Sequence, residues 1–99
     1  MSSLPLTALS GMQAAQTQLD VAAHNVANAQ TPGFRRQQAA LTAQPEGGVQ
    51  ARVTTLAQPG PALETDLVAQ LQAKNAFLAN LAVFRTSNRM AGALLDDQA

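Results

Sequence analysis

Few side chains in this 99-residue chain could do chemistry, and their spacing gives no catalytic set. His24 is the single His and there is no Cys, so no zinc-type ligand set and no thiol nucleophile is available. Ser10, Ser87 and the carboxylates do not recur with a base and an orienting group at workable positions. We therefore expect a protein that is not an enzyme and that uses no metal and no cofactor.

Four of the six basic residues occur in two small groups, Arg35-Arg36 and Arg85/Arg89. Six basic and six acidic residues cancel, and no cluster of aromatic residues accompanies the arginines. A neutral chain of this kind lacks the electrostatic footprint of a nucleic-acid-binding protein. We expect no nucleic-acid partner, and arginines that are solvated or paired between subunits, with Glu46 and Glu64 as candidate partners.

The composition limits the hydrophobic core. Hydrophobic residues make up 46% of the chain, with three Phe and no Trp or Tyr. Small domains usually need disulfides, metals or association, and only association is open here. No apolar run approaches the roughly 18 residues of a membrane span, so we expect no direct membrane insertion. The N-terminus lacks the pattern of a cleavable secretory signal, which alone predicts a cytoplasmic protein.

The first 34 residues predict a lead, a helix and a corner. Residues 1–7 lack periodicity and contain Pro5, which indicates a flexible lead that orders only on contact with something else. In residues 8–34, a helix is expected from about Ala8 to about Gln30, with seam positions spaced alternately by four and three residues. Small and larger side chains alternate along this seam, which consists of Ala8, Met12, Ala15, Leu19, Ala22, Val26 and Ala29.

The helix ends at a strong stop signal. Its residues are Asn25, Asn28, Thr31, Pro32, Gly33 and Phe34. The residue before a proline avoids the α region, and a glycine accepts a positive φ, so the chain should turn sharply at Gly33. We expect Phe34 to fold back onto apolar surface, and the two Asn side chains to bind free carbonyls at the helix end or a neighbouring subunit.

Residues 35–61 change to a composition rich in Gln, Thr, Pro and Gly. Val49, Ala51 and Val53 alternate with period two, which predicts a short hairpin or two irregular strands joined near Pro45-Glu46-Gly47-Gly48. Pro59-Gly60-Pro61 should end this section as a semi-rigid turn.

Residues 62–99 predict a second helix, from about Leu63 to about Leu95, with Glu64 and Asp66 favourably placed against its dipole. The stretch 76–84 is apolar around nearly the whole helix, and one antiparallel neighbour would cover about a third to half of that circumference. Other subunits should cover the rest. The expected seam and interface residues of this helix are Leu67, Leu71, Phe77, Leu78, Leu81, Phe84 and Leu95.

The resulting prediction is an all-α fold: two long helices, N- and C-terminal, in an antiparallel coiled-coil-like hairpin with a short β-like or irregular middle section. Two functions remain open. One is a structural subunit that polymerises helically, and the other is a small soluble helical adaptor that forms a closed bundle and binds a partner helix.

The chain resembles the bacterial flagellar rod and hook axial proteins, and most of all the short proximal rod proteins. The family's first helix leads into an Asn-x-x-Asn-x-x-Thr-Pro-Gly-Phe corner, which the corner residues above match in order. Gln30 departs mildly from the family's usual Asn. The C-terminal helix is similar in an acidic start, a Gln-Ala-x-x-Ala-Phe core at residues 72–77, Ala79-Asn80, Thr86, Met90 and Leu94-Leu95.

This resemblance implies a subunit of the bacterial flagellum basal body, in the periplasmic rod that transmits torque for flagellum-dependent cell motility. It implies export without a cleaved signal peptide through the flagellar type III export apparatus, and helical assembly with itself and other flagellar rod proteins. The short middle section leaves no room for an outer β-domain, so little more than the inner-tube unit is expected.

Overall fold

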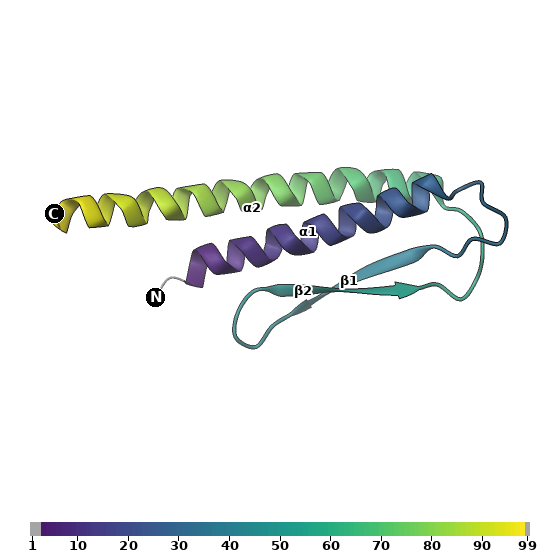
Figure 1. Ribbon diagram of the computed structural model, residues 1–99, viewed down its shortest axis with the longest axis horizontal. Helices are drawn as coiled ribbons and strands as arrows, with labels where there is room; N and C mark the ends of the chain where they lie inside the picture. Colours follow the sequence, from purple (N-terminus) through teal and green to yellow (C-terminus); the bar gives the residue numbers. More distant parts are fainter. Residues whose placement is uncertain (1–2, 99) are drawn as a thin grey trace.

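Two long helices flank one antiparallel β-hairpin in the computed structural model, which describes residues 3–98 (Figure 1). Helix α1 spans Ser3–Ala27, strand β1 Gln37–Ala43, strand β2 Val49–Thr55 and helix α2 Leu63–Gln98. The expectation of two long helices with a short β section between them is confirmed. The middle section is a regular two-stranded sheet, so the fold is mostly helical rather than strictly all-α.

Both ends of α1 differ from the sequence prediction. The helix begins at Ser3 rather than at about Ala8, so the expected lead is helical from residue 3 onward, and residues 1–2 lie outside the described residues. Pro5 is compatible with this start because the first turn of a helix leaves its N–H groups unpaired in any case. The helix ends at Ala27 rather than at about Gln30, because Asn28 already belongs to the turn that follows. That residues 3–7 order only on contact stays a prediction.

The hairpin has a continuous register, with Gln37 opposite Thr55 at its base and Ala43 opposite Val49 at its tip. The tip is closed by a hydrogen bond of 2.9 Å from the Gln44 N–H to the Gly48 carbonyl. Gly47 and Gly48 have φ angles of 104° and 86°, in the region that favours glycine. The predicted hairpin and its connection near residues 45–48 are thereby confirmed.

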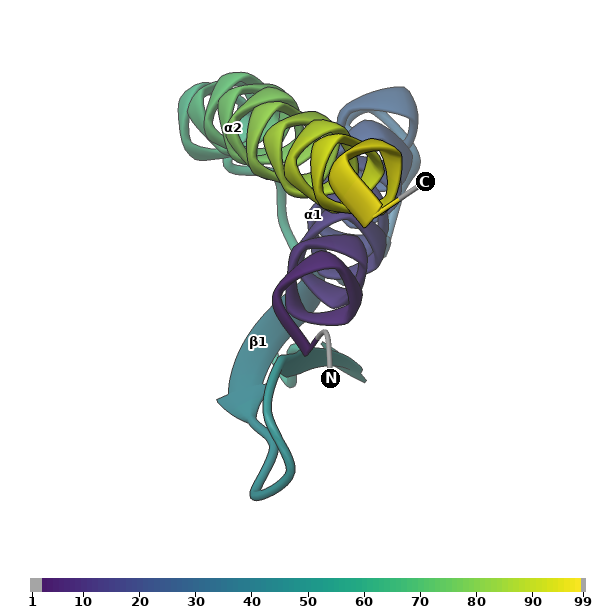
Figure 2. The ribbon, with the colours of Figure 1, turned by 90° about the vertical axis from the view of Figure 1, so that its left-hand side faces the viewer.

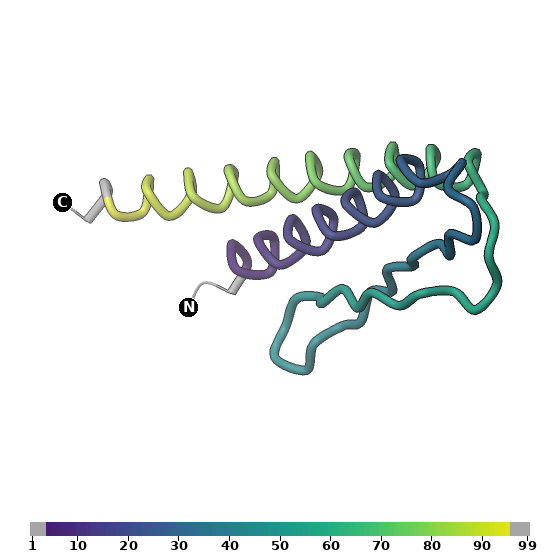
Figure 3. The backbone as a smooth tube through the Cα atoms, turned by 45° about the vertical axis from the view of Figure 1, so that its right-hand side comes forward, coloured from purple at the N-terminus to yellow at the C-terminus, as the bar shows by residue number. Residues whose placement is uncertain are grey.

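Helix α1 is the central layer of the molecule. It packs on α2 on one side and on both strands on another, whereas among the described residues the strands do not pack on α2 (Figure 2). The two helices run in opposite directions, and the hairpin folds back beneath α1 (Figure 3). α2 extends beyond the first turn of α1, so its last turns have no helical neighbour within the molecule (Figure 1).

Small residues set the distance between the helices. A Cβ added to Gly11 would lie 2.5 Å from Oδ1 of Asn80, so any larger residue there would require the Asn80 side chain to move. Ala8, Ala15 and Ala22 of the predicted seam are buried. Its larger members, Met12, Leu19 and Val26, are half-buried, and Ala29 lies in the turn after α1.

The core is thin. The molecule measures 63 × 25 × 13 Å and has a radius of gyration of 17.3 Å, against about 13 Å for a compact domain of this length. Among the residues whose burial is described, the buried apolar side chains are Ala8, Ala14, Ala15, Val21, Ala22 and Ala73. Alanine contributes little apolar area, so the isolated fold gains little stability from hydrophobic burial.

Candidate functional site

The end of α1 is closed by Asn28 and Thr31. The Asn28 side chain donates to the His24 carbonyl at 2.9 Å and accepts a hydrogen bond of 3.2 Å from the Thr31 hydroxyl. The Thr31 N–H donates to the Asn28 carbonyl at 3.0 Å. These contacts satisfy groups that a helix end leaves unpaired, as the sequence predicted for Asn28.

The chain then reverses at Gly33. Its φ of 72° confirms the expected left-handed conformation, and Pro32 precedes it. The Phe34 ring folds back against His24, with ring centroids 5.3 Å apart and an interplanar angle of 62°. His24 is exposed, as expected, and gives Phe34 its contact surface. The Phe34 carbonyl accepts a hydrogen bond of 3.0 Å from the Gly60 N–H, which ties the corner to the segment that leads into α2.

Asn25 is the junction between α1 and the hairpin, and it is 2% exposed. Its Nδ2 donates to the Gln37 carbonyl at 2.9 Å, and its Oδ1 accepts from the Gln37 N–H at 2.8 Å. The same Nδ2 also donates to Oδ1 of Asp66 at 3.2 Å. The expectation that Asn25 caps its own helix or contacts another subunit is wrong within this chain, because the side chain is fully used by β1 and α2.

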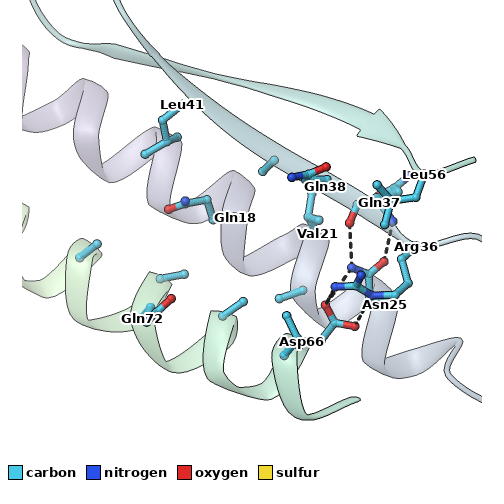
Figure 4. Close-up of a pocket in the computed structure, with 16 residues that line it drawn as sticks. Gln18, Val21, Asn25, Arg36, Gln37, Gln38, Leu41, Leu56, Asp66 and Gln72 are labelled. Atoms are coloured by element: carbon cyan, nitrogen blue, oxygen red, sulfur yellow. Dashed lines mark hydrogen bonds and ion pairs between the residues drawn. The ribbon is translucent and has the colours of Figure 1, made fainter. Parts of the chain in front are cut away.

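An ion pair completes the junction. Arg36 donates from Nε to Oδ2 of Asp66 at 2.9 Å and from a terminal nitrogen to Oδ1, which makes the pair bidentate (Figure 4). The hydrogen bonds from Arg36 lower the pKa of Asp66 against the opposing effect of burial, with a further contribution from Asn25. The hydrogen bond to Asp66 raises the pKa of Arg36. Within residues 3–98, Arg36 pairs with Asp66, and neither Glu46 nor Glu64 forms an ion pair with an arginine of the same chain. Pairing of Glu46 or Glu64 between subunits stays a prediction.

A groove of about 660 Å³ opens beside this junction, between α1, β1 and the first turns of α2 (Figure 4). Val21, Leu41 and Leu56 contribute apolar surface to it, and Arg36 and Asp66 close its polar end. The hairpin is therefore not closely packed on the helices at this point.

The predicted interface residues of α2 differ in exposure, and the exposed leucines among them do not lie on the face that packs against α1. Leu67, Leu71, Leu78 and Leu95 are 47%, 59%, 49% and 68% exposed, whereas Phe77, Leu81 and Phe84 are half-buried. α1 instead packs on the face of α2 that carries buried Asp66, Ala73 and Ser87. The reason is the close helix approach, which admits small side chains and leaves the leucines outside. Their assignment to a subunit interface remains a proposal.

The remaining polar residues form no reactive arrangement in the part of the chain that the structure describes. Ser10 donates to the Thr7 carbonyl at 2.8 Å and accepts from the Val49 N–H at 3.1 Å. No group of three or more His, Cys, Asp or Glu that could hold a metal ion occurs over residues 3–98. Neither described helix is long and apolar enough to cross a membrane. Together, the contacts of Asn25, Arg36 and Asp66 fix the relative positions of α1, β1 and α2.

Sequence reasoning missed the partners in this junction. Gln37, Arg36 and Asp66 carry no periodic signal, and Asp66 reads as an ordinary acidic residue of a first helical turn. The one available sign was an Arg pair directly after the corner, within a chain that has only 12% charged residues.

Comparison with known families gives the assignment. The family model described as flagella basal body rod protein matches residues 6–35, which cover most of α1 and the whole corner through Phe34. Over these residues the chain is similar to the flagellar basal body rod protein family. No curated protein matches the chain.

This similarity supports a structural role in the flagellar basal body. The matched segment ends before Arg36, so the hairpin, α2 and the ion pair lie outside it. In this chain the matched corner is held by the Asn28 cap, the left-handed Gly33 and the Asn25 junction.

Proposed function

We propose that this chain is a structural subunit of the bacterial flagellar basal-body rod, which assembles helically through α1 and α2 to form part of the torque-transmitting axial shaft. The observation that carries this proposal is apolar surface that one molecule leaves open, in a chain whose residues 6–35 match the rod family.

The amount of surface supports association. The accessible area is 6928 Å², whereas a compact protein of 10.3 kDa exposes about 5,350 Å². The excess, about 1,600 Å², matches the area that a standard protein interface buries in total, or about 800 Å² for each of two interfaces per subunit. A subunit with two separate interfaces can form an open helical polymer.

The exposed leucines of α2 are the surface through which we expect the subunits to associate. Leu67, Leu71 and Leu78 lie on one side of α2, away from buried Ala73. Each such side chain contributes about 1.5–3 kcal/mol when fully buried. In the rod, α1 and α2 of one chain would form a coiled-coil-like pair, with neighbouring subunits packed on the leucines.

The same proposal includes partners and location. The chain would pass through the flagellar type III export apparatus without a cleaved signal peptide and assemble in the periplasm with itself and other rod proteins. The short hairpin supports a subunit most like the proximal rod proteins, since it is the only β-structure over residues 3–98.

Seeded assembly tests the proposal. Purified chain is added to isolated basal bodies or rod fragments, and incorporation is measured by sedimentation and electron microscopy. Leu78→Asp should abolish incorporation without unfolding the monomer, because Leu78 is 49% exposed. Ala57→Asp, which adds the same charge at an exposed site after β2, is the matched control and should incorporate normally. Normal incorporation of Leu78→Asp would exclude this interface.

Solution stoichiometry separates the rod subunit from the closed-bundle adaptor. A rod subunit should be monomeric or weakly associated until a seed is present. One fixed stoichiometry across a hundredfold range of concentration would instead support the adaptor.

A further inference from the structure

Two faces of helix α1 contact other elements, and only one of them packs on α2. The first carries Gly11 and Ala15 and meets α2, as the Gly11–Asn80 contact shows. The second carries Ser10, Ala14 and Val21, about 100° further round the helix, at spacings of four and seven residues. We call this second row the hairpin face of α1.

The hairpin covers this second face. Ser10 accepts the Val49 N–H at the tip of the hairpin, and Val21 lines the groove together with β1 residues. Ala14 lies between these two positions and is 4% exposed. The cover is close at its tip, where a Cβ on Gly48 would lie 2.5 Å from Oγ of Ser10.

The hairpin is held firmly to the helices at its base and weakly to α1 at its tip. At the base, Gln37 is held in both directions by Asn25, and the neighbouring Arg36 is paired with Asp66. At the tip, among residues 3–98, one hydrogen bond of 3.1 Å joins the Val49 N–H to the Ser10 side chain of α1. Between them lies the open groove, and most residues of both strands are exposed. A two-stranded sheet of this kind is marginal by itself, so its tip can swing away while its base stays in place.

An exposed side of α2 matches the hairpin face of α1 in the spacing of its residues. Leu71 and Leu78 are seven residues apart on the exposed side of α2, the same spacing as Ala14 and Val21 on the hairpin face. Large side chains at this repeat pack between small ones of a facing helix. The hairpin lies on the side of α1 away from α2 (Figure 2). Leu71 and Leu78 lie on the side of α2 away from buried Ala73, which faces α1, so the hairpin face and the leucine side are separate surfaces.

We propose that the β-hairpin is a removable cover, and that in the assembled state the Leu67, Leu71 and Leu78 side of α2 from a second copy replaces it on the hairpin face of α1. This inference rests on the proposed function and specifies its interface. Because the two surfaces differ and are separate, each copy can receive one neighbour and bind another, as an open helical polymer requires. In the free chain the cover hides one of the two surfaces and so opposes assembly without a seed.

Thiol labelling tests the opening of the cover in the free chain. The protein has no Cys, so Ala14→Cys and Ala15→Cys each introduce one thiol at neighbouring positions that are 4% and 2% exposed. With iodoacetamide, Cys at 14 should react at least tenfold faster than Cys at 15, because only the first lies under the hairpin. Reaction rates within twofold of each other would overturn the inference. Far-UV circular dichroism checks that both variants keep their helices.

A second substitution identifies the contact that holds the tip. In the Ala14→Cys background, Ser10→Ala removes the acceptor for Val49 and should raise the labelling rate several-fold. Thr17→Ala is the matched control, because its hydroxyl bonds only the Gln13 carbonyl of its own helix. Equal effects of the two substitutions would contradict a tip held by Ser10.

A reversible crosslink tests the exchange during assembly. In Ser10→Cys/Gly48→Cys, the two Cβ atoms would lie about 3.2 Å apart, slightly closer than the usual disulfide separation of about 3.8 Å. Cys at position 48 must adopt the positive φ of Gly48 in both redox states, so the reduced form of the same variant is the reference. The oxidised chain should fail to incorporate into seeded rods, and reduction should restore incorporation. Equal incorporation in both redox states overturns this inference and leaves the proposed function intact. Failure of the unmodified chain to incorporate counts against the proposed function, while the labelling rates still decide whether the hairpin opens.

Discussion

The side-chain amide of Asn25 pairs with the backbone of Gln37 as a neighbouring strand would. Its Oδ1 accepts the Gln37 N–H at 2.8 Å, and its Nδ2 donates to the Gln37 carbonyl at 2.9 Å. A helical residue thus sets the first position of β1, and the same amide contacts Asp66 in the first turn of α2. Three elements that are distant in sequence meet at one side chain.

Asn25→Ala should therefore destabilise the protein by about 2–3 kcal/mol, because it leaves buried polar groups of Gln37 and Asp66 without a partner. Asn25→Asp should cost more, since it places a second carboxylate beside Asp66. Urea unfolding followed by circular dichroism measures both. Gln38→Ala, at the exposed next position of β1, should change stability by less than about 0.5 kcal/mol. An Asn25→Ala variant as stable as this control would show that Asn25 does not hold α1, β1 and α2 together.

Stability should fall as the pH drops below about 4. The pKa of Asp66 is lowered in the folded chain by hydrogen bonds from Arg36 and then Asn25, so the unfolded chain, with an ordinary Asp pKa of about 3.9, takes up the proton more readily. The contribution of Asp66 is present above the unfolded pKa and is lost as the pH falls through the folded pKa. Unfolding free energies measured from pH 7 to pH 2 should show this loss.

Asp66→Asn should flatten that pH profile and lower stability at pH 7, because Arg36 then loses its charged partner. Glu64→Gln, in the same helical turn but exposed, is the matched control and should keep the decline. A profile of unchanged steepness in Asp66→Asn would assign the acid sensitivity to another group.

Two glycines should respond oppositely to Ala. Gly33 has a φ of 72°, and nothing lies within 4 Å of an added Cβ, so Gly33→Ala introduces backbone strain alone and should cost about 1–2 kcal/mol. Gly92 lies within α2 with equally open space, and Gly92→Ala should stabilise the helix by about 0.5–1 kcal/mol. Thermal unfolding of the two variants measures this difference in sign. A stabilising Gly33→Ala would be incompatible with the left-handed corner.

Gly11→Ala should destabilise the helix pair, because the added Cβ would overlap the side chain of Asn80, 2.5 Å away at Oδ1. Asn80 would have to rotate and lose its hydrogen bond of 2.9 Å to the Ala76 carbonyl. Asn80→Ala in the same chain should relieve the overlap, so the double variant should be more stable than the sum of the single effects. A double-mutant cycle in urea gives the coupling, and additive effects would mean that the helices do not approach here.

The local signals in the sequence were sufficient for the elements. Pro32 and Gly33 act on neighbouring backbone dihedrals, and the alternation at Val49, Ala51 and Val53 reflects the two-residue repeat of a strand. The corner, the hairpin and both helices could therefore be predicted from residues close together in the chain. The sequence prediction starts α1 too late because residues 1–7 lack periodicity and contain Pro5, whereas Pro5 fits the first turn of a helix.

By itself, the sequence determined the chain reversal at Gly33, the small-residue row Ala8, Ala15 and Ala22, and the shortage of large apolar side chains for a core. Only the tertiary structure decided that Arg36 pairs with Asp66, that Asn25 joins β1, and that α2 turns Ala73 rather than Leu71 toward α1. The physical reason is the distance along the chain over which each effect acts. Dihedral preferences and periodicity act between near neighbours, whereas the partner of a buried charge and the face chosen by a helix depend on how closely two distant backbones approach.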